Sequence, residues 1–308
     1  MSAQINERYK KAWLVTTAIA KMLIAAKVGD QIPTIQEYVD ILSSSRGVVQ
    51  NALQTLQNEG AITLEKRGKM GSIITEIDTD SLFSMSGISF ITGSMPMPFN
   101  DPLIGIATGV SISMGDCTIP FSFAFVQGGV NRVNALLRGM YDFVILSKCA
   151  ALYHVTANPN IEIALTLEGC VYSKQYVFCS FSKEITKPMD GMIIAADPKA
   201  TDQFKITSEM CKGKNIELVQ CAFSACISMF LERKVDGIVY HKDEWTKAEG
   251  IWTHPIENFD EAGLYTPALL TTKNNHAVGH ILRAHLFDSD IAKIQEEVTN
   301  KKRHPQFC

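Results

Sequence analysis

The sequence lacks the features that mark secreted, membrane-spanning or disulfide-stabilised proteins. Its first residues are polar and contain no apolar core of a signal peptide. No stretch reaches the roughly 18 uninterrupted apolar residues that a membrane-spanning helix needs. The eight cysteines are scattered and include no Cys-x-x-Cys pair, which indicates free thiols in a reducing compartment. We therefore expect a cytoplasmic protein that does not associate with a membrane.

Short motifs of common enzyme chemistry are also missing. There is no Walker loop, no Gly-x-Gly-x-x-Gly fingerprint and no Gly-x-Ser-x-Gly elbow. His276 and His280 have a spacing that suits metal ligands, but no carboxylate accompanies them, so we interpret them as ordinary histidines. Cys221 and Cys226 are interpreted as small buried side chains. The sequence thus predicts no catalytic residue, no metal and no cofactor.

What the composition does provide is a globular chain of about two domains. Its 308 residues are 46% hydrophobic and 20% charged, which is enough for a sizeable core. The net charge is −3, so any contact with nucleic acid requires a local basic patch. Residues 1–75 carry nine Lys or Arg against six Asp or Glu, a small basic surplus.

An amphipathic segment that begins at Ser45 has an apolar and a polar face. Val49, Leu53 and Leu56 recur at helical spacing, and Gly60 stands where a helix would end. Arg and Gln near the start of such a helix can form bidentate hydrogen bonds with base edges in a major groove. A serine and free N–H groups at the helix start can hold a phosphate. The alternative is the solvated face of an ordinary surface helix.

The neighbouring segments favour DNA binding. A helix over residues 7–27 precedes a turn, and Thr34 with Glu37 forms a capping box for a second helix that ends at Leu42. Residues 61–66 and 72–75 alternate like strands around a basic turn. This order predicts a winged helix-turn-helix over residues 1–76. The predicted DNA-contacting residues are Thr34, Ser45, Arg46, Gly47, Gln50, Asn51, Lys66, Arg67 and Lys69.

The same region resembles the DNA-binding domain of GntR-type bacterial transcription regulators. The resemblance is carried by the run from Gly29 to Thr34, the run from Ser45 to Leu53, and the wing glycines Gly68 and Gly71. It implies sequence-specific contact with double-stranded DNA, usually by a homodimer.

Residues 77–87 are rich in Asp, Thr and Ser and are predicted to be a linker. From residue 88 to 308, short strands alternate with helices, which predicts an α/β domain. The runs 127–131 and 138–145 resemble a helix-then-strand unit of the type II periplasmic-binding-protein fold, with two lobes around a ligand cleft. The two parts together are similar to the YhfZ family of GntR-like regulators, which implies transcription regulation by an unassigned effector.

Ligands of open α/β sheets lie beyond the carboxyl ends of strands, where helix N-termini supply N–H groups. Two such termini and a lysine favour a carboxylate or phosphate ligand. The predicted ligand-binding residues are Ser94, Met95, Gln127, Gly128, Gly129, Ser147, Lys148, Asp197, Thr201 and Tyr240.

These observations lead to one main hypothesis and one alternative. The main hypothesis is a DNA-binding transcription regulator with an α+β head and a two-lobed α/β domain that binds a small anionic effector. The alternative is an enzyme or a solute-binding protein of the two-lobed fold, in which the winged helix serves only for dimerisation.

Overall fold

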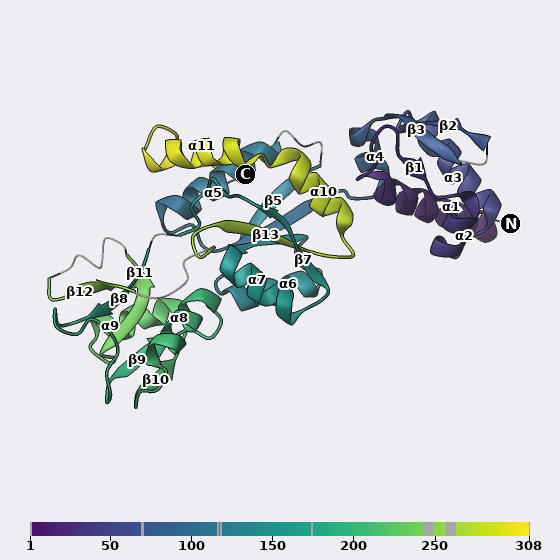
Figure 1. The fold of residues 1–308 in the computed structure, drawn as a ribbon. Coiled ribbons are helices and arrows are strands. Elements are labelled where there is room, and N and C mark those ends of the chain that lie inside the picture. Colours follow the sequence, from purple (N-terminus) through teal and green to yellow (C-terminus); the bar gives the residue numbers. More distant parts are fainter. Residues whose placement is uncertain are drawn as a thin grey trace. The chain divides into compact units, whose positions relative to one another are not determined.

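The computed structural model describes residues 2–68, 71–115, 117, 119–173, 175–242, 249–256 and 263–307. These residues form two compact units, which are described separately (Figure 1). The first unit comprises mainly residues 1–91, and the second comprises mainly residues 92–274 and 282–308.

The first unit is a winged helix-turn-helix. Its helices are α1 (Ser2–Leu23), α2 (Ile35–Leu42), α3 (Arg46–Asn58) and α4 (Thr79–Met85). Its small antiparallel sheet has the order β1 (Gln31–Ile32), β3 (Ser72–Ile77), β2 (Ile62–Lys66). Both α1 and α2 pack against α3, which confirms the predicted fold of this region.

Local capping explains where α2 begins and where α3 can follow it. The Thr34 hydroxyl accepts a hydrogen bond from the Glu37 N–H (3.3 Å), and the Glu37 carboxylate accepts one from the Thr34 N–H (2.6 Å). The predicted capping box is therefore present. Ser43 ends α2 in the left-handed conformation, with φ 46°, which reverses the chain in a short turn. Ser45 is the N-cap of α3, but its hydroxyl makes no capping bond.

The spacing of apolar residues in the sequence predicts that the first helix buries a stripe of Trp13, Leu14, Ala18, Met22, Leu23 and Ala26. The buried face of α1 is a different one. Trp13 and Leu14 are 53% and 58% exposed, whereas Val15, Ile19 and Leu23 are buried. Apolar residues surround the second half of this helix on nearly all sides, so hydrophobic periodicity does not fix which side faces the core.

The predicted linker contains a helix of the first unit. Asp78 caps α4 through its carboxylate, which accepts hydrogen bonds from the N–H groups of Asp80 (3.1 Å) and Ser81 (3.4 Å). Leu82 and Phe83 of this helix are fully buried. The polar composition of the segment made its short apolar face difficult to recognise in the sequence. The first unit therefore extends beyond residue 76.

The second unit has two lobes, each built on a five-stranded sheet. The sheet of the first lobe has the order β5 (Phe121–Phe125), β4 (Ile91–Met95), β6 (Phe143–Ser147), β13 (Pro267–Thr272), β7 (Ile161–Thr166). Strand β4 is parallel to β6, and β13 is antiparallel to β6 and β7. The helices that follow or precede these strands are α5 (Asp101–Gly115), α6 (Gly129–Leu137), α7 (Lys148–Ala157) and α11 (Asp288–Thr299). Helix α10 (His276–His285) is divided between the two units, because residues 275–281 belong to the first unit.

The second lobe is a continuous insertion between β7 and β13. Its sheet has the order β10 (Glu217–Gln220), β9 (Ile193–Ala196), β11 (Gly237–His241), β8 (Tyr176–Ser180), β12 (Trp252–Pro255). Helices α8 (Thr201–Cys211) and α9 (Phe223–Leu231) pack on it. The chain therefore passes between the lobes twice, once after β7 and once before β13.

Helices α5 and α11 approach each other closely enough that only glycine fits between them. A Cβ at Gly105 would lie 2.7 Å from Gln295 Cγ, and one at Gly109 would lie 2.8 Å from Ile291 Cγ2. The buried Gln295 amide also donates to the Val171 carbonyl (2.7 Å) and accepts from the Val171 N–H (2.8 Å). This contact anchors the first of the two segments that connect the lobes.

Candidate functional sites

The polar face of α3 is open to solvent. Val49, Leu53 and Leu56 are buried, and the opposite face presents exposed polar residues. The predicted DNA-contacting residues on that face are Arg46, Gly47, Gln50 and Asn51, and all four are exposed. Arg46 and Gln50 are four residues apart, so they lie on one edge of the helix. The fold therefore presents them as a recognition helix does.

The wing offers further basic groups. Lys66 and Arg67 are exposed, and Arg67 pairs with Glu65 at 3.2 Å while both side chains stay about half exposed. Such a pair is weak and can be exchanged for a phosphate contact. Lys69 lies outside the described residues. Thr34 is exposed, but its hydroxyl is used in the capping box.

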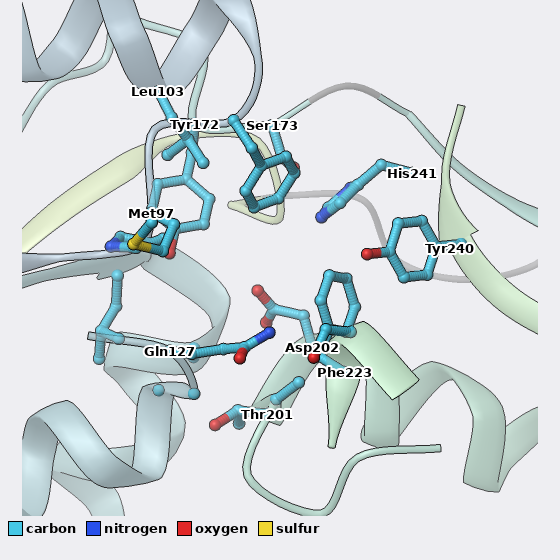
Figure 2. Close-up of a pocket in the computed structure, with 18 of the residues that line it drawn as sticks. Met97, Leu103, Gln127, Tyr172, Ser173, Thr201, Asp202, Phe223, Tyr240 and His241 are labelled. Atoms are coloured by element: carbon cyan, nitrogen blue, oxygen red, sulfur yellow. The ribbon is translucent and has the colours of Figure 1, made fainter. Parts of the chain in front are cut away.

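In the second unit, residues of both lobes surround a cavity of about 590 Å³ (Figure 2). This volume is typical of pockets for small molecules. The first lobe contributes residues at the start of α6 and after β4, and the second contributes residues of α8, α9 and β11. Tyr172 and Ser173 line the cavity from the segment that connects the lobes.

Half of the predicted ligand-binding residues lie in the cavity wall, namely Gln127, Gly128, Gly129, Thr201 and Tyr240. Gly128 is the N-cap of α6 and has φ 84°, a conformation that favours glycine. A Cβ there would lie 3.1 Å from the Lys199 Cβ of the second lobe. The glycine therefore allows the two lobes to approach at the cavity edge.

Two predicted residues are instead inside the sheet. The sequence predicts a strand over residues 88–91, whereas the strand observed here, β4, runs over Ile91–Met95. Ser94 and Met95 are consequently fully buried strand residues that do not line the cavity. The boundary was wrong because Gly93 and Ser94 resemble a turn, whereas Gly93 is needed where the Phe143 ring crosses the strand: a Cβ would lie 2.4 Å from it.

Three further predicted residues support the structure around the cavity rather than line it. Lys148 forms a surface ion pair with Glu168 at 2.7 Å. The buried Asp197 carboxylate accepts hydrogen bonds from the Lys199 N–H (2.8 Å) and the Phe223 N–H (2.9 Å), which fixes the start of α9. Ser147 caps α7 and stands behind the cavity wall.

Sequence reasoning missed the two charged residues of the wall. Arg132 lies in the first turns of α6, just beyond the predicted Gly128 and Gly129, and Asp202 follows the predicted Thr201. Both are buried, with 4% and 7% of their surface exposed. Extending each predicted helix start by one turn would have included them.

Both charged groups are held by neutral partners. The Arg132 guanidinium donates to the Val126 carbonyl (2.7 Å) and to the Tyr172 hydroxyl (3.3 Å). The Asp202 carboxylate accepts a hydrogen bond from the Ser147 hydroxyl (2.6 Å). Burial raises the pKa of Asp202 to about 6, although the Ser147 hydrogen bond and the charge of Arg132 oppose this shift.

Aromatic rings form much of the remaining wall. Phe223 and Tyr240 are stacked with ring centroids 4.3 Å apart, and Tyr176 and His241 are 4.2 Å apart. Figure 2 shows Phe223, Tyr240 and His241 around the same space as Asp202. Such a wall suits an apolar or aromatic group of a ligand.

Direct hydrogen bonds join the two lobes beside the cavity. The Ser147 hydroxyl of the first lobe donates to Asp202 of the second. His154 Nε2 of α7 lies 3.1 Å from the Thr201 hydroxyl of α8. Burial lowers the pKa of His154, and the charge of Arg132 lowers it further. The two lobes are therefore in direct contact beside the cavity.

This architecture agrees with known proteins. Residues 78–307 match the family described as the YhfZ C-terminal domain, and residues 27–74 match a helix-turn-helix domain. The chain belongs to the YhfZ family. It is 27% identical over 303 residues to the protein YhfZ of Escherichia coli (strain K12), covering 97% of this chain and 98% of that protein.

Solved structures support the same fold. The crystal structure of YhfZ from Shigella flexneri has a TM-score of 0.62 at 22% identity, covering 74% of this chain and 97% of that chain. The periplasmic aliphatic sulphonate binding protein SsuA from Escherichia coli has a TM-score of 0.53 at 12% identity, covering 70% of this chain and 75% of that chain. The predicted periplasmic-binding-protein-like fold of the YhfZ part is thereby confirmed.

None of the described helices is both long and apolar enough to span a bilayer. Within the same residues, no three His, Cys, Asp or Glu side chains come together as a metal site would require.

Proposed function

We propose that this protein is a transcription regulator that binds DNA through its winged helix and senses a small molecule in the inter-lobe cavity. Arg46 and Gln50 would read bases in the major groove, and Ser45, Lys66, Arg67 and Lys69 would hold phosphates. The observation that carries the proposal is the exposed polar face of α3 within a helix-turn-helix. Such a regulator acts on DNA in the cytoplasm.

The effector half of the proposal is supported by the cavity. It combines a volume of about 590 Å³ with a buried arginine, Arg132. A guanidinium binds a carboxylate through two parallel hydrogen bonds, so we propose an effector that carries a carboxylate. Phosphate is a weaker candidate, because a second negative charge would lie in the same cavity as Asp202.

We propose that two copies act together. Two recognition helices related by a twofold axis would reach successive major grooves, roughly 34–36 Å apart. The exposed Trp13 and Leu14 of α1 offer an apolar surface suited to such a contact. Effector binding would regulate transcription if it favours one spacing of the two heads over another.

A selection experiment tests the DNA half directly. Purified full-length protein is incubated at low ionic strength with a random pool of 30-base-pair duplexes, and the retained duplexes are sequenced. We expect an enriched motif with two related half-sites, since a dimer reads a palindrome. Arg67→Ala should lower the slope of log affinity against log salt by about one, whereas the exposed Lys212→Ala in the second unit should not. A pool that shows no enrichment and no retention contradicts the proposal.

The alternative is a two-lobed enzyme or solute-binding protein with a head that only dimerises. A ligand that binds the cavity without any DNA binding by the dimer would support it. No observation in the described residues favours catalysis over binding, so the regulator remains the proposed function.

A further inference from the structure

The cavity wall contains two buried groups of opposite charge, one from each lobe. Arg132 belongs to α6 of the first lobe and Asp202 to α8 of the second. Among the described residues, neither forms an ion pair within 4.0 Å. Their hydrogen-bond partners are a carbonyl and two hydroxyls. Each charge is therefore removed from water without a direct counter-charge, an arrangement that ordinarily destabilises a protein.

The same two residues keep polar atoms without hydrogen bonds. Arg132 Nε and Asp202 Oδ1 are buried and have no partner among the described residues, and the same holds for the hydroxyl of Ser173, another wall residue. Buried polar atoms in native proteins are nearly always paired, and each exception requires an explanation. Here all three atoms belong to residues that line one cavity, which are the residues that a polar ligand in this cavity would contact.

The two charges restrict the chemistry of that molecule. A simple carboxylic acid would pair with Arg132 but would bring a negative charge towards Asp202. A simple amine would pair with Asp202 but would bring a positive charge towards Arg132. A molecule with both charges satisfies both residues and introduces no net charge beside these two buried groups.

We propose that the effector is a small zwitterion of the amino-acid type, whose carboxylate pairs with Arg132 and whose ammonium group pairs with Asp202. The stacked rings of Phe223 and Tyr240 line the remaining space together with the tilted pair of Tyr176 and His241, which suits an apolar or aromatic side chain. This inference rests on the proposed sensing role of the cavity and narrows the effector to one chemical class. Because the charged partners come from different lobes, such a ligand would also hold the lobes together.

Matched ligand series test the proposal on the wild-type protein. Each series contains an amino acid, the amine that lacks its carboxylate and the acid that lacks its amino group. The probes are L-leucine with isoamylamine and 4-methylpentanoate, L-phenylalanine with phenethylamine and 3-phenylpropanoate, and L-methionine with 3-(methylthio)propylamine and 4-(methylthio)butanoate. Calorimetric titration of the full-length protein measures each affinity.

We expect at least one amino acid to bind at least about 100-fold more tightly than both of its truncated analogues, because each truncation leaves a buried charge of the wall unpaired. The proposal is overturned if an acid or an amine binds as tightly as its amino acid. It is equally overturned if none of the nine compounds binds.

Two variants locate the charges. Asp202→Asn should lower the preference for the amino acid over the matching acid at least tenfold, and Arg132→Gln should weaken the amino acid and the acid while sparing the amine. Glu209→Gln makes the same chemical change as Asp202→Asn at an exposed position of α8 and should leave every preference unchanged. A purely structural role of either residue would instead weaken all three compounds alike. If a variant fails to fold, the wild-type series decide the matter.

DNA binding, measured without ligand on the same preparations, separates this inference from the proposed function. Selective DNA binding with no amino-acid binding overturns the ligand class alone. Amino-acid binding by a folded dimer that ignores DNA overturns the regulator alone.

Discussion

Two polar surfaces of this protein differ in almost every physical respect. On α3, Arg46, Gln50 and Asn51 come from one short stretch and are exposed. In the cavity, Arg132 and Asp202 come from separate helices in different lobes and are buried, with polar atoms that no described residue satisfies. The first surface can change without affecting the core, whereas the second is part of the packing that closes the lobes. Substitutions in the first unit, called the head here, can therefore change function without changing stability. In the second unit, called the body here, a substitution at these residues changes both.

Gly105→Ala should give the largest effect on stability, because it acts on the packing of the body. The added Cβ would lie 2.7 Å from Gln295 Cγ and 2.8 Å from Gln295 Cα, and backbone at this distance cannot move aside as a flexible side chain does. Overpacking of this kind lowers the free energy of unfolding by about 1–3 kcal/mol, and we expect a loss of about 3 kcal/mol. Urea unfolding, followed by circular dichroism, measures this loss.

Gly115→Ala is the matched control for this helix. It lies at the end of α5, and a Cβ there would meet nothing within 4 Å. An unchanged unfolding midpoint for Gly105→Ala would show that α5 and α11 are not tightly packed. Both variants should leave the affinity for DNA unchanged, because the substitutions lie in the second unit and the DNA contacts are expected in the first.

Asp202→Asn should change how stability depends on pH. The native pKa of Asp202 is raised to about 6 from an ordinary value of 3.8, so the unfolded chain releases this proton at lower pH than the folded chain does. The contribution of Asp202 is therefore fully present below about pH 4 and is lost as the pH rises to about 6. Two pKa units correspond to about 3 kcal/mol, taken as an upper value.

The measurement is the difference in urea midpoint between wild type and Asp202→Asn from pH 4 to pH 7.5. The amide cannot ionise but can still accept the Ser147 hydrogen bond, so the wild type should lose stability relative to the variant as the pH rises. Parallel pH profiles would mean that Asp202 is not desolvated. Glu209→Gln should follow the wild-type profile.

Arg46→Ala tests the opposite kind of surface. Because Arg46 is exposed, replacing its side chain should change the free energy of unfolding by less than about 0.5 kcal/mol. If it reads a guanine, discrimination at one base pair of the selected motif should fall by about 1–3 kcal/mol. Fluorescence anisotropy with the selected duplex and single-base variants measures this loss. Equal weakening on every sequence would reassign Arg46 to a phosphate contact.

The contrast between the two surfaces also explains what the sequence could and could not predict. The head was predicted through local signals: the capping box of Thr34 and Glu37, the periodicity of α3 and the basic turn of the wing. Two predictions for this unit were wrong. The buried side of α1 was misjudged because apolar residues surround the helix, and α4 was missed because its apolar residues lie in a polar segment. Base contacts themselves stay a prediction.

The cavity needed information that no local pattern contains. The rule that ligands lie at strand ends placed Gln127, Gly128 and Thr201 correctly in the wall. It failed for Ser94 because the end of β4 was misjudged, and it could not show that Arg132 and Asp202 would face one cavity. The return of the chain to the first lobe depends on β13, a strand after the second lobe that pairs with β6 and β7 and that the pattern did not predict.

Gly47→Ala should have a small effect on stability, with the opposite sign to Gly105→Ala. A Cβ at Gly47 would meet nothing within 4 Å, and alanine is favoured over glycine in helices by about 0.5–1 kcal/mol, so we expect a gain of about 0.5 in this first turn. If α3 enters a major groove, the methyl group would also hold the backbone away from phosphate, and the selected duplex should bind several-fold more weakly. Urea unfolding and fluorescence anisotropy are measured on the same samples of wild type and Gly47→Ala. The expected result would show that Gly47 lowers the free energy of unfolding and raises the affinity for DNA. A gain in stability with unchanged affinity would instead place Gly47 outside the interface and narrow base recognition to the edge formed by Arg46 and Gln50.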